Sequence, residues 1–173
     1  MLLEGNDDER FAQKVLGPIL EDHYDSIVFW KHAEATTKRV VKLMHCIIAK
    51  RSDYIYFGDI NSQPCVGSKK QDVLSGLRRI DTNKIVVVIQ EIEGWYLAGL
   101  GETASAALGI PHYSTTDNIT KEQFDAIKPK RLPSRIHFMV EIIKNFSIDT
   151  AMRKNRSFKY FCGKYFGGAH REE

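Results

Sequence analysis

The stretch Tyr54-Ile55-Tyr56-Phe57-Gly58-Asp59-Ile60-Asn61 decides the fold that we expect for this chain. Its aromatic and β-branched residues are typical of a buried strand, and the run ends at a glycine followed by an acid, where a strand reaches its loop. Because side chains two apart on an extended chain point the same way, Asp59 and Asn61 could present two oxygen ligands to one point. Both residue types also form turns, so a simple turn at this position stays open.

Two other predicted strands also end in acidic residues. The chain opens with a short apolar run that is followed by Glu4. Residues 84–89 give the strongest strand signal, and Glu91 and Glu93 follow them. In an open parallel sheet the strand ends lie along one edge, and ligands bind there. Acids gathered on one edge repel one another unless a cation lies between them, so the pattern predicts a divalent-ion site.

Helical patterns alternate with these strands. Residues 36–51 have apolar positions at helical spacing, and they follow a strand predicted at residues 26–32. Another helix is predicted from about Asp8, with acids in its first turn, where the helix dipole favours them. This βαβ alternation predicts an α/β fold with an open, mostly parallel sheet flanked by helices. We expect residues 1–127 to form this core and residues 128–173 to form a basic, helical C-terminal extension packed on the same domain.

Four short motifs resemble parts of Toprim-like proteins. Leu-Leu-Glu-Gly-Asn-Asp-Asp-Glu-Arg-Phe at residues 2–11 resembles the first motif of the Toprim domain, and Phe-Gly-Asp-Ile-Asn at residues 57–61 stands where that family carries Asp-x-Asp. Residues 88–99 and the basic Ser-Phe-x-x-Phe segment at residues 157–161 are similar to segments of small stand-alone, OLD-nuclease-related Toprim-like proteins. Toprim domains occur in topoisomerases, primases and nucleases. The resemblance therefore implies a Rossmann-like Toprim fold and metal-dependent chemistry on nucleic acid.

The resemblance also implies a site for Mg²⁺ or Mn²⁺. Glu4 is either a general acid/base or a ligand in that comparison, whereas Asn61 departs from the family because it replaces a charged aspartate with a neutral amide. Asp8 has an alternative role as a charge at the amino end of a helix. The glutamates after the last strand could restore the charge that Asn61 lacks. The predicted metal ligands are Glu4, Asp8, Asp59, Asn61, Glu91 and Glu93.

Basic residues supply candidate contacts to phosphate. Lys69 and Lys70 end a loop predicted at residues 62–70, close to the proposed metal edge. They could stabilise charge in phosphoryl chemistry there, or else be solvated loop residues. A cationic, proline-bounded linker begins at residue 128 and could follow a phosphate backbone. The last helix has an apolar pattern complete for packing, with bases that could face a polyanion. The predicted nucleic-acid contacts are Lys128, Lys130, Arg131, Arg135 and Arg156.

Composition bounds the class of protein. With 173 residues, 43% hydrophobic and 27% charged, the chain fits a single globular domain, and a net charge of +3 does not by itself indicate nucleic-acid binding. We find no apolar run of about 18 residues and no signal-peptide pattern, so we expect no membrane span and a cytoplasmic location. The three cysteines are odd in number and widely spaced, which argues against a disulfide framework and a structural zinc site.

The favoured functional hypothesis is Mg²⁺-dependent phosphodiester hydrolysis or transfer on DNA or RNA, with Glu4, Lys69 and Lys70 as catalytic residues. Two alternatives stay open. One is a non-catalytic Toprim-like module that binds nucleic acid or protein, which Asn61 and the small size favour. The other is a hydrolase of nucleotides or other small phosphates. The sequence does not identify a protein partner.

Overall fold

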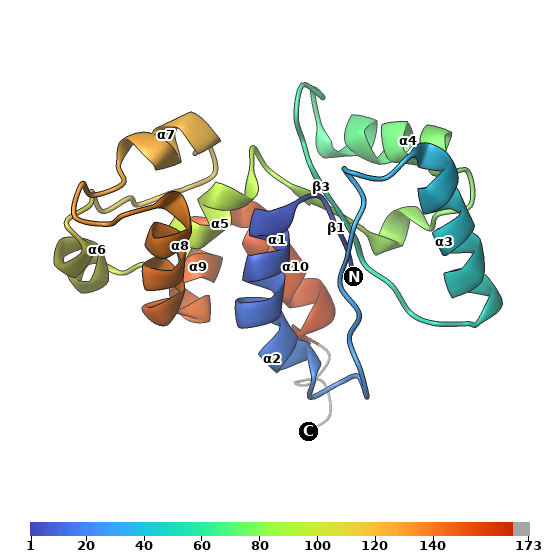
Figure 1. The fold of residues 1–173 in the computed structure, drawn as a ribbon, viewed down its shortest axis with the longest axis horizontal. Helices are drawn as coiled ribbons and strands as arrows, with labels where there is room; N and C mark the ends of the chain where they lie inside the picture. Colours follow the sequence, from blue (N-terminus) through green and yellow to red (C-terminus); the bar gives the residue numbers. More distant parts are fainter. Residues whose placement is uncertain (168–173) are drawn as a thin grey trace. The chain divides into compact units, whose positions relative to one another are not determined.

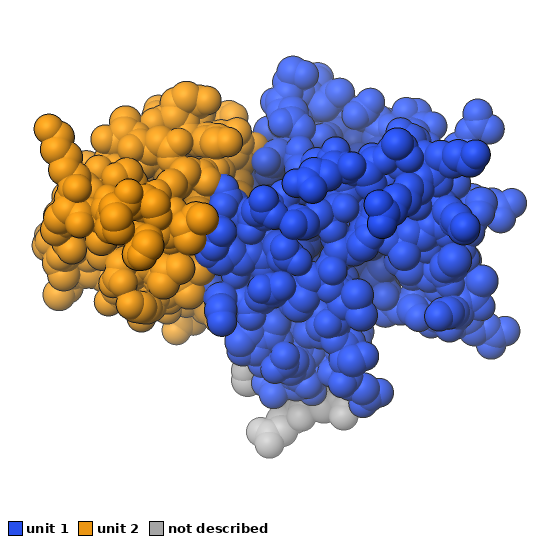
Figure 2. Space-filling view, viewed as in Figure 1, with its two compact units in different colours: residues 1–88 blue, residues 89–173 orange. Residues whose placement is uncertain are grey.

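The structure describes residues 1–167 of the chain, and Figure 1 shows it as a computed structural model. The chain forms two compact units, residues 1–88 and residues 89–173 (Figure 2). The boundary follows Val88, whereas the sequence analysis places its boundary after Ile127. The α/β core is therefore shorter than expected, and the helical part begins earlier.

One parallel sheet organises the first unit. Within residues 1–167, four strands pair in the order β2-β1-β3-β4, and each neighbouring pair is parallel. The strands are β1 (Leu2–Leu3), β2 (Trp30–Lys31), β3 (Tyr56–Asp59) and β4 (Ile85–Val88). The predicted α/β fold with an open parallel sheet and flanking helices is thus confirmed, although β2 covers only part of the strand expected at residues 26–32.

Helical segments connect and cover these strands. They are α1 (Asn6–Phe11), a π-helical turn η1 (Ala12–Leu16), α2 (Gly17–Leu20), α3 (Thr37–Ala49), α4 (Val66–Leu77) and a 3₁₀ turn η2 (Thr82–Lys84). The π-helical turn immediately precedes Gly17 and Pro18, and a proline disturbs the regular hydrogen bonding of a helix. Figure 1 shows α3 and α4 on one side of the strands and α1 and α2 on the other.

Apolar side chains of the strands are buried on both faces of the sheet. On the face of α3 and α4, one continuous cluster consists of Leu2, Val40, Met44, Tyr56, Val73, Leu77, Ile80, Ile85 and Val87. Leu3, Phe57, Val86 and Val88 alternate with the strand members of that cluster and are also buried. A strand buried on both faces has little polar surface of its own, so polar function is confined to its ends.

The order of the strands creates a switch point between β1 and β3. The chain goes from β1 to β2 on one side, and then crosses to β3 on the other side. In open parallel sheets, ligands bind at the carboxyl ends of the strands beside such a switch point. The topology therefore directs attention to the residues that follow Leu3 and to the last residue of β3, Asp59.

The second unit is helical in its described part. Its helices are α5 (Ile92–Ala98), α6 (Glu102–Leu108), α7 (Lys121–Ala126), α8 (Arg135–Lys144), α9 (Ile148–Lys154) and α10 (Arg156–Tyr165). A core of aromatic side chains holds them together, formed by Trp95, Tyr96, Phe124, Phe138, Phe158 and Phe161. Gly99 allows close packing, because a Cβ atom there would overlap the ring of Phe146. A capping box between Thr120 and Gln123 begins α7.

Within residues 1–167, no helix combines the length and apolar composition that a membrane crossing requires. Cys46, Cys65 and Cys162 are free thiols, and only Cys162 is buried.

Candidate functional site

Residues from three strand ends come together at the switch point through hydrogen bonds to the backbone of β3. Glu4 follows β1, His32 follows β2, and Asp59 ends β3. The Glu4 carboxylate accepts a hydrogen bond from the backbone N–H of Asp59, with 2.7 Å between Oε2 and N. The structure therefore brings Glu4 and Asp59 together although 55 positions separate them in the chain.

These side chains complete the hydrogen bonding of β3. A longer β1 would pair the backbone of Glu4 with the carbonyl of Phe57 and the N–H of Asp59, following the register of the two strands. Instead, β1 ends before Glu4, whose carbonyl accepts from the N–H of Ala33 at 3.3 Å. The Phe57 carbonyl lies 2.7 Å from Nε2 of His32, while the Asp59 N–H donates to the Glu4 carboxylate. Two side chains thus replace two ladder hydrogen bonds.

The contacts of His32 define its tautomer. Because a carbonyl oxygen can only accept, Nε2 must carry the hydrogen that is donated to Phe57. In the neutral ring Nδ1 is then the acceptor, and the hydroxyl of Tyr56 lies 3.4 Å from it. The two rings stack, with centroids 4.4 Å apart and planes 16° apart. Burial lowers the pKa of His32, which favours this neutral form.

Glu4 and Lys69 supply opposite charges to this cluster. Burial, together with the negative charges of Glu4 and Asp72, raises the pKa of Tyr56 to about 12. Glu4 also acts to raise the pKa of His32, against the larger effect of burial, whereas Lys69 acts to lower it. The site therefore contains an anion and a cation that act on the same buried histidine.

Lys69 reaches the strand end across Gly58. A Cβ atom at residue 58 would lie 3.2 Å from Cε and 3.8 Å from Nζ of Lys69, so the missing side chain makes room for the lysine. Lys69 and Lys70 are half-buried residues of α4, which begins at Val66, and they are not in the loop that the sequence suggested. Of these two lysines, Lys69 is the one whose side chain lies beside Gly58.

Asp8 and Asn61 have local roles at the ends of secondary structure. Asp8 is 7% exposed, and its Oδ2 accepts from the N–H of Gly5 at 3.1 Å, which corresponds to the alternative helix-terminal role. Asn61 is exposed and has a left-handed backbone with φ of 51°. Since β3 ends at Asp59, the alternation that would aim Asp59 and Asn61 at one point does not extend to Asn61.

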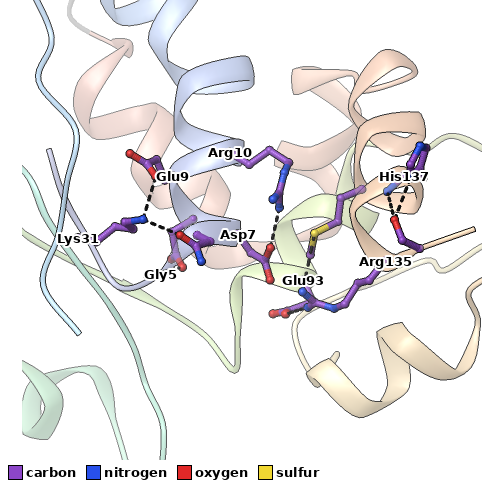
Figure 3. A network of polar contacts seen from close by, with 12 residues as sticks. Gly5, Asp7, Glu9, Arg10, Lys31, Glu93, Arg135 and His137 are labelled. Atoms are coloured by element: carbon purple, nitrogen blue, oxygen red, sulfur yellow. Dashed lines mark hydrogen bonds and ion pairs between the residues drawn. The ribbon is translucent and has the colours of Figure 1, made fainter. Parts of the chain in front are cut away.

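Other acids of α1 are paired with cations of the first unit. Asp7 binds Arg10 at 2.6 Å, while Lys31 donates to Asn6 at 2.6 Å and lies 3.4 Å from Glu9 (Figure 3). These contacts connect α1 with β2 and hold the turn that follows β1.

Glu91 and Glu93 lie in the second unit and make contacts within it. Glu91 accepts from the backbone N–H of Lys121 at 2.5 Å. Glu93 is 3% exposed and forms an ion pair with Arg135, which also binds Asp125 at 2.6 Å (Figure 3). A buried carboxylate requires such a partner. These contacts give Glu93 and Arg135 a structural role, and the metal and nucleic-acid roles suggested by the sequence stay predictions.

The remaining predicted nucleic-acid contacts differ in how they are used. Lys128 donates to a backbone carbonyl of its own linker at 3.0 Å, and Arg131 donates to two carbonyls at the carboxyl end of α6. Lys130 is exposed. Arg156 binds Asp117 through Nε at 2.6 Å, yet its side chain is 80% exposed. Lys130, Arg131 and Arg156 are thus exposed, whereas Lys128 and Arg135 are half-buried.

The residues at the switch point could supply Mg²⁺ with only a few protein ligands. Within residues 1–167, no three His, Cys, Asp or Glu side chains group closely enough to hold a metal ion. Mg²⁺ nevertheless needs only one or two carboxylates when water and substrate phosphate complete its shell. Glu4 and Asp59 provide such oxygens from adjacent strand ends, and Oε1 of Glu4 makes no hydrogen bond within the described residues.

Comparison of this chain with protein-family models, with curated proteins and with solved structures finds no match.

Proposed function

We propose that the protein hydrolyses phosphodiester bonds in nucleic acid with the help of Mg²⁺, at the switch point between β1 and β3. The observation that carries this proposal is the meeting of Glu4 and Asp59, joined by a 2.7 Å hydrogen bond. Lys69 supplies a positive charge to the same cluster across Gly58. Carboxylates at adjacent strand ends, with a cation beside them, are suited to the chemistry of phosphate esters. The Toprim-like motifs of the sequence agree with this proposal.

Glu4 has two oxygens with different tasks in this mechanism. Oε2 is held by the Asp59 N–H, so the carboxylate has a defined orientation. Oε1 accepts the proton of the water molecule that attacks phosphorus, while the bond from phosphorus to the leaving oxygen breaks and that oxygen takes a proton from solvent. Lys69 stabilises the negative charge on the phosphate oxygens.

Asp59 would hold the metal ion, with water and substrate phosphate completing its shell. When bound, Mg²⁺ polarises a phosphoryl oxygen and lowers the pKa of a coordinated water. His32 and Tyr56 stay outside the reaction, because the ring nitrogens of His32 are used by the Phe57 carbonyl and the Tyr56 hydroxyl. They orient the strand end that presents Asp59.

Cleavage of end-labelled single-stranded DNA and RNA tests the proposal, with Mg²⁺, with Mn²⁺ and with EDTA. Glu4→Gln and Asp59→Asn should each reduce the rate by about 10²-fold or more, since general-base catalysis alone contributes about 10²–10⁴-fold. Lys69→Gln should also reduce it, whereas the exposed Lys38→Gln on α3 is the matched charge control. The proposal fails if wild-type protein shows no metal-dependent cleavage, or if Glu4→Gln is fully active.

A second candidate is a non-catalytic binding module. The observation in its favour is that Glu4 and His32 serve as hydrogen-bond partners of β3, which gives both residues a purely structural reason to be present. Oligonucleotide binding that needs no metal, without cleavage, would support this candidate. The same assay with nucleotides in place of DNA and RNA tests the remaining alternative, a hydrolase of small phosphates.

A further inference from the structure

The outer surface of α9 and α10 differs from the core beneath it. Phe158, Phe161 and Cys162 face inward on α10 and are at most 2% exposed. Tyr160 lies on the same helix and is 53% exposed. The aromatic residues of α10 therefore have two different uses, and packing does not account for Tyr160.

Cations lie on both sides of Tyr160 along the helix. Arg156 and Lys164 are four residues before and four residues after it, and this spacing places all three side chains on one stripe. Nζ of Lys164 lies 5.6 Å from the centroid of the Tyr160 ring. The side chain of Arg156 is 80% exposed even though its Nε binds Asp117, so its terminal nitrogens remain accessible.

A hollow of about 480 Å³ adjoins this stripe, lined by residues of α9 and of the start of α10. Its lining residues are Asp149, Met152, Arg153, Asn155, Arg156 and Lys159. Arg153, Arg156 and Lys159 are exposed, and together with Lys164 they place four cations on this surface. Asp149 and Asp117 are the carboxylates that oppose them. The excess of positive charge favours a polyanion.

We infer that this surface, Arg153, Arg156, Lys159, Tyr160 and Lys164, binds single-stranded nucleic acid. The cations of the hollow contact backbone phosphates, and an unpaired base stacks on the ring of Tyr160. An exposed aromatic ring beside cations is a sequence-tolerant platform for a base, and only a single strand exposes the face of a base for stacking. The inference rests on the proposed function insofar as it names single strands as the substrate class, but binding itself requires no catalysis.

Fluorescence anisotropy with labelled oligonucleotides tests the inference on the full-length chain. The probes are single-stranded DNA, single-stranded RNA and duplex DNA, each of about 15 nucleotides or base pairs. The Glu4→Gln background and EDTA prevent turnover. We expect both single strands to bind more tightly than the duplex, and a difference between the two strands identifies the preferred sugar.

Variants separate stacking from charge. Tyr160→Ala should raise the Kd about tenfold, while Tyr160→Phe should stay within about twofold because it keeps the ring. Arg153→Gln should reduce the salt dependence of log Kd by about 0.7, the value for one phosphate of a single strand. Lys144→Gln on α8 is the charge control, since its side chain is 61% exposed and does not line the hollow.

Three results would overturn the inference. They are unchanged binding by Tyr160→Ala, duplex binding as tight as that of single strands, and an equal loss in Lys144→Gln. If Tyr160→Ala does not change metal-dependent cleavage, the proposed function holds and the role of this surface is refuted. If binding depends on Tyr160 but the wild-type protein cleaves no substrate, the binding surface holds and the proposed function is refuted.

Discussion

Removal of the Glu4 carboxylate should weaken the protection of one backbone amide. The Asp59 N–H donates to Oε2 of Glu4 at 2.7 Å, and a hydrogen bond to a charged group contributes about 1.5–3 kcal/mol. Both residues are half-buried, so water partly replaces the lost acceptor. We therefore expect Glu4→Ala to lower the free energy of local opening at Asp59 by about 1–2 kcal/mol, which is about 5–30-fold in the opening equilibrium.

Amide hydrogen exchange measured by NMR reads this effect directly. Glu4→Gln is the matched variant, because its side-chain carbonyl still accepts a hydrogen bond, and we expect at most about threefold faster exchange. The neighbouring amide of Ile60 donates to the carbonyl of Val88 at 2.9 Å and should not change. Wild-type exchange at Asp59 in Glu4→Ala would refute the reasoning. Equal acceleration in the two variants would show that charge, and not the hydrogen bond, protects the amide.

Three further predictions concern packing, thiol reactivity and pH. Gly99→Ala should destabilise the protein by about 1–3 kcal/mol through overpacking, whereas Gly163→Ala on an open part of α10 should be neutral or stabilising by up to about 1 kcal/mol; equal urea midpoints would contradict this. Hydrogen bonds with the first turn of α4 lower the pKa of Cys65, and burial raises the pKa of Cys162 to about 12. Iodoacetamide should therefore modify Cys65 before Cys162, and peptide mapping that finds these two modified together in the folded protein would exclude this order. Because burial lowers the pKa of His32, the unfolded chain binds the proton first, so stability is full above about pH 6.5 and falls as the pH drops through the folded pKa; His32→Gln should flatten that fall in urea titrations, and an unchanged pH profile would argue against it.

The sequence predicted the parts of the fold that have strong local signals. The strand that ends at Asp59 and the helix expected at residues 36–51 were predicted from strand propensity and helical spacing, and the structure contains both, the helix as α3. The meeting of Glu4 and Asp59 followed from the rule that parallel strands end along one edge. The first two arguments succeed because each uses the pattern of a single element, and the third because the topology of a parallel sheet fixes where its strands end.

Other features depend on contacts that no local pattern encodes. The pairing of Glu93 with Arg135 spans 42 positions, so the burial that requires it could not be read from either residue. Asn61 was placed on an extended chain, but the strand ends two residues earlier and the backbone turns left-handed. His32 was missed although it ends a predicted strand, and the strand-end argument used for Glu4 would have found it.

Each unit of the molecule contains one of the two tryptophans of the chain. Trp30 belongs to β2 and is half-buried, whereas Trp95 is fully enclosed in α5. A shielded indole emits at shorter wavelength than one that water reaches, so the two fluorophores have distinguishable emission. In a variant that keeps a single tryptophan, the fluorescence emission therefore reports the unfolding of the unit that contains it. A substitution at the Glu4 site that destabilises the first unit would change the emission of Trp30. One near Tyr160 that destabilises the second unit would change the emission of Trp95.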